Sequence, residues 1–284
     1  MGSFLGLAVG DALGAPLEGL AAPSERICSM IGGGVHNLKK GECTDDTLQA
    51  VALARSLILC RSLDPDDLIP RLLEGYRERP YCYGPTSSAA FQEILAGTVP
   101  QGQGPGQRKE TETGRTNGSI MRGLPLGIFF PPGEVREPSL ACSRITHPHA
   151  VAGECSAFVN TMISFLCRGA RKEEAYRNAL TRCESAELRP ILEQYEHYPL
   201  TPSMDAVWTT HCAVRILLES ADFTDALITA VNLGGDADTI GSVSGALAGA
   251  AWGVDAIPSD WLVCLQDHCD LRSLARDLVK VAYD

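Results

Sequence analysis

Glycine recurs at every fourth position in two segments near opposite ends of this chain of 284 residues. The two series are Gly6, Gly10, Gly14 and Gly241, Gly245, Gly249, Gly253. A glycine inside a helix costs about 1 kcal/mol relative to alanine, and residues four apart share one helix face. Such a stripe predicts a helix surface that another backbone approaches closely. We expect the two glycine-bearing helices to pack tightly and to hold Asp11, Glu18 and Asp236 near one another.

Elsewhere, apolar residues recur with the spacing of amphipathic helices, and alternating strand patterns are scarce. Examples are the runs at 48–58 and 158–166. Segments rich in glycine or proline separate such runs, at 31–34, 100–106 and 131–138. With 45% hydrophobic and 21% charged residues, the chain is long enough to bury a full core. These features predict an all-α protein, and we expect one domain over residues 1–284.

The amino-acid composition limits which binding partners and which cellular compartment are expected. A net charge of −11 and a pI near 5.0 disfavour a nucleic-acid or anionic-membrane surface, so any phosphate group must be held locally. The 11 cysteines are scattered without a C-x-x-C pair, which favours reduced thiols. We find no targeting signal, and the apolar stretch at 240–254 is too short to span a membrane. We expect a cytoplasmic monomer.

The glycine-rich and charged segment 102–118 is either a flexible lid or a disordered loop.

Two short acidic clusters each precede an apolar helical run: Thr44-Asp45-Asp46-Thr47 and Asp236-Ala237-Asp238-Thr239. Taken singly, each cluster is explained by helix capping, because Thr and Asp cap helix N-termini and acidic side chains complement the helix dipole. One cap needs only one side chain, however, and several like charges at one helix start repel one another unless a cation neutralises them. Should the fold bring the clusters together, their oxygens would suit Mg²⁺, Mn²⁺ or Ca²⁺. Metal-assisted hydrolysis is therefore the leading hypothesis.

Several motifs, in order along most of the chain, resemble the ADP-ribosylglycohydrolase family, which includes the dinitrogenase reductase-activating glycohydrolase and the ADP-ribosyl-acceptor hydrolases. They are GLAVGDALG at 6–14, TDDT at 44–47, NGSIMR at 117–122, TH at 146–147 and NLGGDADT at 232–239. The resemblance implies an all-α, compact, orthogonal multi-helix bundle with a binuclear Mg²⁺ or Mn²⁺ centre at the base of an ADP-ribose cleft. It also implies hydrolysis of an N- or O-glycosidic bond that links ADP-ribose to a protein or a small molecule. The family's metal ligands match Thr44, Asp45, Asp46, Asp236, Asp238 and Thr239.

The resemblance also assigns roles around the cleft. Asp45, Asp46 and Asp238 would stabilise the positive charge that develops on the ribose ring, besides holding the metals. Glu18 is the candidate acid–base residue, although a solvated loop carboxylate is an equal interpretation. The segment 117–122 reads either as a turn into a helix or, by resemblance, as the ribose and phosphate loop. The substrate-binding residues that the resemblance implies are Asn117, Gly118, Ser119, Met121, Arg122, His147, Gly234 and Gly235.

Other interpretations remain open on the sequence. His147 and His149 have no Cys or His partners at the spacing of a zinc site, so we do not expect structural zinc. Some relatives carry an acidic residue near the position of Cys82, and a neutral thiol does not replace a carboxylate in acid–base chemistry. A non-catalytic ADP-ribose or nucleotide binder is therefore the alternative from another class. A two-metal phosphohydrolase acting on nucleotides is a further enzymatic alternative.

Overall fold

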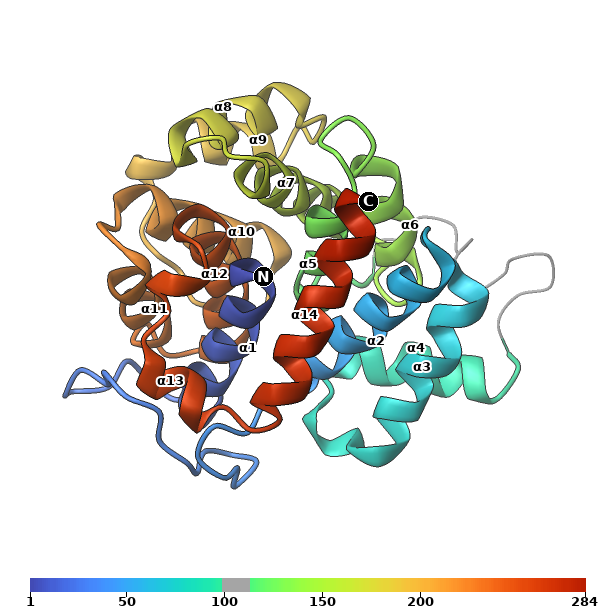
Figure 1. Cartoon of the computed structure of the whole chain (residues 1–284), viewed down its shortest axis with the longest axis horizontal. Helices are drawn as coiled ribbons and strands as arrows, with labels where there is room; N and C mark the ends of the chain where they lie inside the picture. Colours follow the sequence, from blue (N-terminus) through green and yellow to red (C-terminus); the bar gives the residue numbers. More distant parts are fainter. Residues whose placement is uncertain (99–112) are drawn as a thin grey trace.

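The computed structural model describes residues 1–98 and 113–284, and within them all regular secondary structure is helical (Figure 1). The α-helices are α1 Gly2–Gly14, α2 Asp45–Cys60, α3 Pro65–Glu78, α4 Pro85–Leu95, α5 Gly118–Phe129, α6 Arg136–Arg144, α7 Ala150–Cys167, α8 Lys172–Arg182, α9 Leu188–Glu193, α10 Ala206–Glu219, α11 Phe223–Val231, α12 Ala237–Trp252, α13 Ser259–Cys264 and α14 His268–Tyr283. The expected all-α bundle is confirmed. Most of the expected lid or disordered loop at 102–118 lies outside the described residues.

Figure 1 shows α1 beside α12, and the glycine stripes of the two helices face each other. A Cβ atom built on Gly6 would lie 2.1 Å from the carbonyl oxygen of Gly245, and one on Gly10 would lie 2.0 Å from that of Gly241. The pairing is antiparallel, because the partner numbers fall as the α1 numbers rise. Only hydrogen fits between these backbones, so the expected close packing is confirmed.

The ends of this helix pair differ from the pattern seen in the sequence. Gly2, which the four-residue series did not include, packs against Gly249, whereas Gly14 packs against Ala237. Gly253 lies beyond the end of α12 with a φ of 84°, and a Cβ there would meet nothing within 4 Å. It ends the helix in a backbone conformation that favours glycine. The glycine stripe of α1 therefore includes Gly2, and the stripe of α12 does not include Gly253.

The remaining helices wrap this pair. Figure 1 shows α2, α3 and α4 on one side of the molecule and α10 and α11 on the other, with α14 between them. Buried apolar residues from α1 to α14 form one continuous core. By length and composition alone α7 would also pass as a membrane-spanning helix, but 72% of it is buried inside the bundle, as in a core helix. The loop expected at 131–138 is shorter, because α6 begins at Arg136.

Candidate active site

The two acidic clusters meet at one cavity of about 200 Å³. Asp45 and Asp46 come from the first turn of α2, and Asp236 and Asp238 come from the start of α12. The hydroxyl of Thr239 lies 3.5 Å from Oδ1 of Asp46, which directly joins segments 193 positions apart in the sequence. The starts of α4 and α5 line the same cavity. Several helix N-termini therefore point their positive dipole ends at one place.

Capping explains only part of the first cluster. Thr44 is the N-cap of α2, and its hydroxyl accepts a hydrogen bond of 3.4 Å from the Asp46 amide. Thr44 does not line the cavity, in contrast to the position expected for a metal ligand. The side chains of Asp45 and Asp46 take no part in that cap, and at α12 the N-cap residue Asp236 makes no side-chain capping bond among the described residues. The surplus carboxylates therefore need another explanation.

Asp11, on α1, binds the start of α2 and does not line the cavity. Its buried carboxylate accepts hydrogen bonds from the amide and hydroxyl of Thr44, at 3.0 and 2.9 Å, and from those of Thr47, at 3.0 and 2.5 Å. Amides at a helix start lack intrahelical partners, and Asp11 supplies acceptors from another helix. The glycine-packed pair therefore positions the first turn of α2, and with it Asp45 and Asp46.

The loop before α12 is held by backbone contacts. Gly234 and Gly235 have φ values of 70° and 62°, which glycine adopts without strain. The Gly235 amide donates to the Leu20 carbonyl, and the Gly19 amide donates to the Gly235 carbonyl, both at 2.7 Å. Neither Gly234 nor Gly235 lines the cavity, so the structure gives them a positioning role instead of the expected substrate contact. They tie the segment that carries Glu18 to the start of α12.

The carboxylates of the site are hard to ionise. Burial raises the pKa of Asp45, Asp46 and Asp238 well above the usual value, and neighbouring carboxylates raise it further. Burial also raises the pKa of Asp11 and Asp236 to about 6, against the lowering effect of hydrogen bonds from Thr47 and Asn117. Nearby cationic charge would reverse these shifts, because it favours the ionised forms.

The donor set fits hard divalent cations. Oδ2 of Asp46 and Oδ1 of Asp238 are buried, and within the described ranges neither has a hydrogen-bond partner. Unpaired buried acceptors are costly, and Mg²⁺ and Mn²⁺ prefer such oxygens. In the part of the chain that the structure describes, no three His, Cys, Asp or Glu groups converge tightly enough to enclose an ion. The carboxylates thus face a shared cavity and do not form a closed cage.

Glu18 lines the cavity just after a short 3₁₀ turn, Ala15–Leu17. Its Oε2 lies 3.0 Å from Nε2 of His36, and the ring of His36 lies 6.0 Å from that of Tyr81. Glu18 therefore lies at the cavity with a partly buried side chain and is not a freely solvated loop residue. Cys82 also lines the cavity, and burial raises the pKa of its thiol to about 12, so it stays neutral.

The predicted substrate loop is only partly placed at the cavity. Asn117, Gly118 and Met121 line it, whereas Ser119 bonds to the Ala152 carbonyl in the core. Arg122 differs most from the expectation of a phosphate ligand. Its guanidinium is fully buried, and it donates to Gln49, Thr146 and the carbonyl of Cys142. Its charge is turned inward, away from any ligand.

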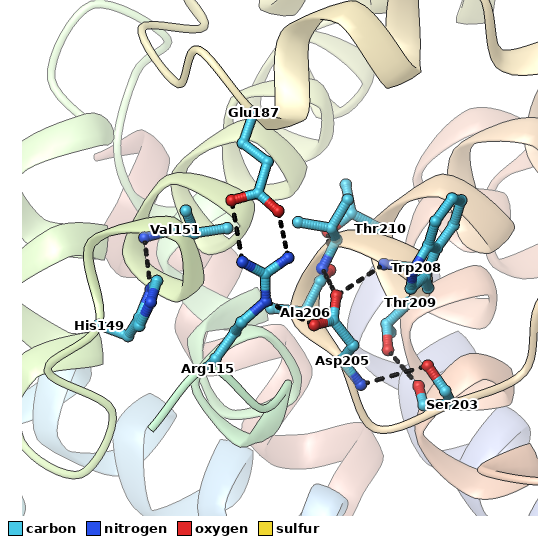
Figure 2. A network of polar contacts seen from close by, with 11 residues as sticks. Arg115, His149, Val151, Glu187, Ser203, Asp205, Ala206, Trp208, Thr209 and Thr210 are labelled. Atoms are coloured by element: carbon cyan, nitrogen blue, oxygen red, sulfur yellow. Dashed lines mark hydrogen bonds and ion pairs between the residues drawn. The ribbon is translucent and has the colours of Figure 1, made fainter. Parts of the chain in front are cut away.

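His147 lines the cavity, and the absence of a side chain at Gly118 makes room for its ring, since a Cβ there would lie 2.8 Å from Cε1 of His147. Burial lowers the pKa of His147 to about 3, so the ring is neutral. His149 instead caps α7 by accepting from the Val151 amide at 3.2 Å (Figure 2). The histidine pair is therefore divided between the cavity and a helix cap.

The segment that enters α5 is clamped by Arg115, a residue that the sequence analysis did not single out (Figure 2). Arg115 pairs with Glu187 and, at 2.6 Å, with Asp205, which caps α10. Backbone bonds join the Asn117 amide to the Met204 carbonyl and the Ala206 amide to the Arg115 carbonyl. Asn117 donates from Nδ2 to Asp236 and thereby orients this carboxylate.

Comparisons with known proteins agree with this geometry. The sequence matches the family described as ADP-ribosylglycohydrolase over residues 1–284. It is 35% identical to the ADP-ribosyl-[dinitrogen reductase] glycohydrolase of Rhodospirillum rubrum, with 92% of this chain and 88% of that protein covered. It is 30% identical to the ADP-ribosylarginine hydrolase Tri1 of Pseudomonas putida, with 98% and 76% covered. A solved ADP-ribosylglycohydrolase-related protein complex superimposes with a TM-score of 0.87 at 35% identity, over 99% of this chain and 96% of that one. The chain belongs to the ADP-ribosylglycohydrolase family.

Proposed function

We propose that this protein is a hydrolase that removes ADP-ribose from a modified acceptor, with two divalent cations, Mg²⁺ or Mn²⁺, held by the cavity carboxylates. The observation that carries the proposal is the meeting of Asp45 and Asp46 with Asp236 and Asp238 at one cavity. Their raised pKa values and unpaired buried oxygens favour cation binding over a purely structural role. Family membership across the whole chain supports the substrate class. We also assign the activity to a single-domain monomer of the cytoplasm, in keeping with its eleven unpaired cysteines.

An arginine-linked acceptor is the first candidate. The relative from Pseudomonas putida is named an ADP-ribosylarginine hydrolase, and it aligns with 98% of this chain. A guanidinium is a planar cation that matches carboxylate geometry, and Glu18 stands at the same cavity as the aspartates. The guanidinium of the leaving group would thus lie next to the carboxylates of the cavity. The bond cleaved would be the N-glycosidic bond at the anomeric carbon.

The residues of the cavity suit the charge changes of this reaction. Cleavage of a ribosyl bond builds positive charge on the ring, which the carboxylates of Asp46 and Asp238 can stabilise. When bound, cations of this class orient oxygen ligands and lower the pKa of water. Asp45 and Asp236 are held in place by Gln49 and Asn117, and Thr239 and Thr44 would complete the oxygen donors after a shift of Thr44 toward the cavity.

Glu18 is the group we assign to proton transfer. Its Oε2 lies 3.0 Å from Nε2 of His36, which does not line the cavity. Cys82 cannot take this role, because its thiol holds its proton throughout the physiological pH range. Asn117, Gly118, Met121 and His147 would contact the ribose, phosphate or adenosine groups. A Glu18→Gln variant should retain binding of ADP-ribose and lose turnover.

The test is release of free ADP-ribose from arginine-linked and serine-linked ADP-ribosyl substrates in Mg²⁺, in Mn²⁺ and with chelator. We expect metal-dependent release from the arginine-linked substrate. Asp45→Asn and Asp238→Asn should each reduce turnover at least about 100-fold, because each removes a charged group from the reacting centre. Circular dichroism should show that both variants retain their helices.

A capping residue outside the site provides the matched control. Asp64 is the N-cap of α3 and accepts from the Asp66 amide at 3.0 Å. Asp64→Asn makes the same chemical change and should leave turnover unchanged. Full activity in Asp45→Asn would overturn the proposal. Tight ADP-ribose binding without release would favour the non-catalytic binder, and phosphate release from nucleotides would favour the phosphohydrolase.

A further inference from the structure

A continuous chain of hydrogen bonds runs through the wall of the cavity and starts at the buried Arg122. Nη1 of Arg122 donates to Oε1 of Gln49 at 3.0 Å and to Oγ1 of Thr146 at 2.8 Å. Arg122, Gln49 and Thr146 are all buried. An arginine has only donors and keeps its charge, so it sets the direction of every bond that follows.

The first branch leads to Asp45. Because Oε1 of Gln49 accepts from Arg122, its amide nitrogen must face the other way. Nε2 of Gln49 donates to Oδ2 of Asp45 at 2.7 Å. Arg122 therefore orients the acidic side of the cavity without touching a carboxylate, and its buried charge is linked to Asp45 through one amide.

The second branch leads to His147. Within the described residues, Oγ1 of Thr146 has two hydrogen-bond partners, Arg122 and Nδ1 of His147 at 2.8 Å. The oxygen accepts from Arg122, so the single hydroxyl hydrogen is satisfied only if it points to Nδ1. Nδ1 is then an acceptor, and the proton of the neutral ring resides on Nε2. The depressed pKa of His147 agrees with a neutral ring.

The same donor-to-acceptor direction continues along the hydrogen bonds from His147 to the cavity surface. Nε2 of His147 lies 3.0 Å from Oγ1 of Thr116, and Thr116 donates to Oγ1 of Thr86 at 3.0 Å. Thr86, Thr116 and His147 all line the cavity. With the proton on Nε2, each hydroxyl accepts from the previous member and donates to the next. The chain ends at the Thr86 hydroxyl, which lines the cavity and, in the described part of the protein, keeps its hydrogen free to donate to a ligand.

We propose that Arg122 and Thr146 are positioning residues that hold His147 in its Nε2–H tautomer and thereby make the Thr86 and Thr116 wall a hydrogen-bond donor for the ligand. The wall is matched to ligand oxygen atoms of the phosphoryl or sugar type. Asp45, which Gln49 orients, presents carboxylate oxygens to the same cavity. One buried arginine thus orients both a donor and an acceptor of the cavity lining. The binding consequence rests on the proposed function, whereas the tautomer does not.

The direct test is the tautomer of His147 in the full chain with ¹⁵N-labelled histidine, read from long-range proton–nitrogen correlations at pH 7. The signal is identified by its loss in His147→Gln. We expect the Nε2–H pattern, with Nδ1 as a hydrogen-bonded acceptor. In Thr146→Val, the Nδ1 signal should move toward that of a nitrogen without a hydrogen bond, and Thr146→Ser should restore it. A wild-type Nδ1–H tautomer or a charged imidazolium would overturn the proposal.

The second readout is ADP-ribose affinity by calorimetry. Thr146→Val should weaken binding about fivefold to tenfold, as loss of one oriented hydrogen bond does, while Thr146→Ser stays within about twofold. Thr161→Val is the matched control, because among the described residues this buried hydroxyl bonds only within α7, at 2.7 Å from the Ala157 carbonyl. Wild-type affinity in Thr146→Val would refute the wall role. If the wild type bound no ADP-ribose, the proposed function would fail, and the tautomer measurement would still decide the network.

Discussion

Asp11 connects the core to the site through a single side chain. It belongs to the glycine-bearing helix α1, and its carboxylate accepts the backbone and hydroxyl hydrogens of Thr44 and Thr47. A buried acceptor of several donors is expensive to replace, because each donor left without a partner costs about 1 to 3 kcal/mol. The residue therefore matters for stability and for the position of Asp45 and Asp46.

Asp11→Asn should lower the free energy of unfolding by about 2 to 4 kcal/mol, since an amide nitrogen would face donors that now meet an oxygen. Urea denaturation measures this change. Asp222→Asn is the control, because Asp222 is an exposed cap of α11 and its replacement by another good cap residue should cost less than about 0.5 kcal/mol. Equal effects in the two variants would contradict the role assigned to Asp11.

The buried carboxylates also predict an unusual pH dependence. Asp238 has a folded-state pKa well above its unfolded value because of burial and then the neighbouring Asp236. A group with a raised pKa supports folding at low pH, and this support is lost as the pH rises through the folded pKa. In chelator at pH 7.5, Asp238→Asn should therefore raise the melting temperature by about 2 to 4 °C, corresponding to about 1 kcal/mol.

The difference in melting temperature between Asp238→Asn and the wild type should shrink as the pH falls from 7.5 toward 4, which is near the pKa of an aspartate in the unfolded chain. Saturating Mg²⁺ or Mn²⁺ at pH 7.5 should reverse the order and leave the wild type more stable. Thermal scans followed by circular dichroism measure both effects. A destabilised Asp238→Asn in chelator at pH 7.5 would show that the carboxylate has a structural partner.

At the scale of elements, the close packing of α1 against α12 depends on glycines, which have no side chains at the contact. Gly→Ala in a helix ordinarily stabilises by about 1 kcal/mol, but a Cβ on Gly10 would lie 2.0 Å from the Gly241 carbonyl oxygen. Rigid backbone cannot yield as a side chain can. Gly10→Ala should therefore lower the free energy of unfolding by at least about 3 kcal/mol in urea denaturation.

Gly153→Ala on α7 is the control for Gly10→Ala. Its Cβ would first meet Cδ2 of Leu140 at 3.0 Å, the mobile end of a side chain. We expect a change within about 1 kcal/mol, because helix propensity and mild crowding oppose each other. A tolerated Gly10→Ala would mean that the helix pair has room to separate.

At the scale of the whole molecule, the cavity joins distant parts of the chain. Asp45 and Asp238 belong to helices on different sides of the bundle (Figure 1). A ligand that binds only the folded state adds about 2.7 kcal/mol at a concentration 100 times its Kd. Mn²⁺ or Mg²⁺ should therefore raise the melting temperature and slow hydrogen exchange at the starts of α2 and α12 together. Asp45→Asn should lose both responses, and protection of one helix alone would contradict a shared site.

The sequence by itself determined the helical class, from apolar spacing and the glycine stripes, and singled out the carboxylates, because surplus like charges at a helix start have few structural explanations. Their chemical type and position are local information. Only the tertiary structure decided which candidates face the cavity. Arg122 turns inward, Thr44 caps α2, and Gly234 and Gly235 hold a turn.

The residues that complete the site were also decided by tertiary structure. Gln49, one turn after Asp45, carried a weak signal in its i+4 spacing, whereas Arg115 and His36 carried none. The physical reason is that a side chain's direction depends on which donors and acceptors other helices bring to it. Thr239 and Asp46 lie 193 positions apart in the sequence, and only the packing of the helices sets them side by side.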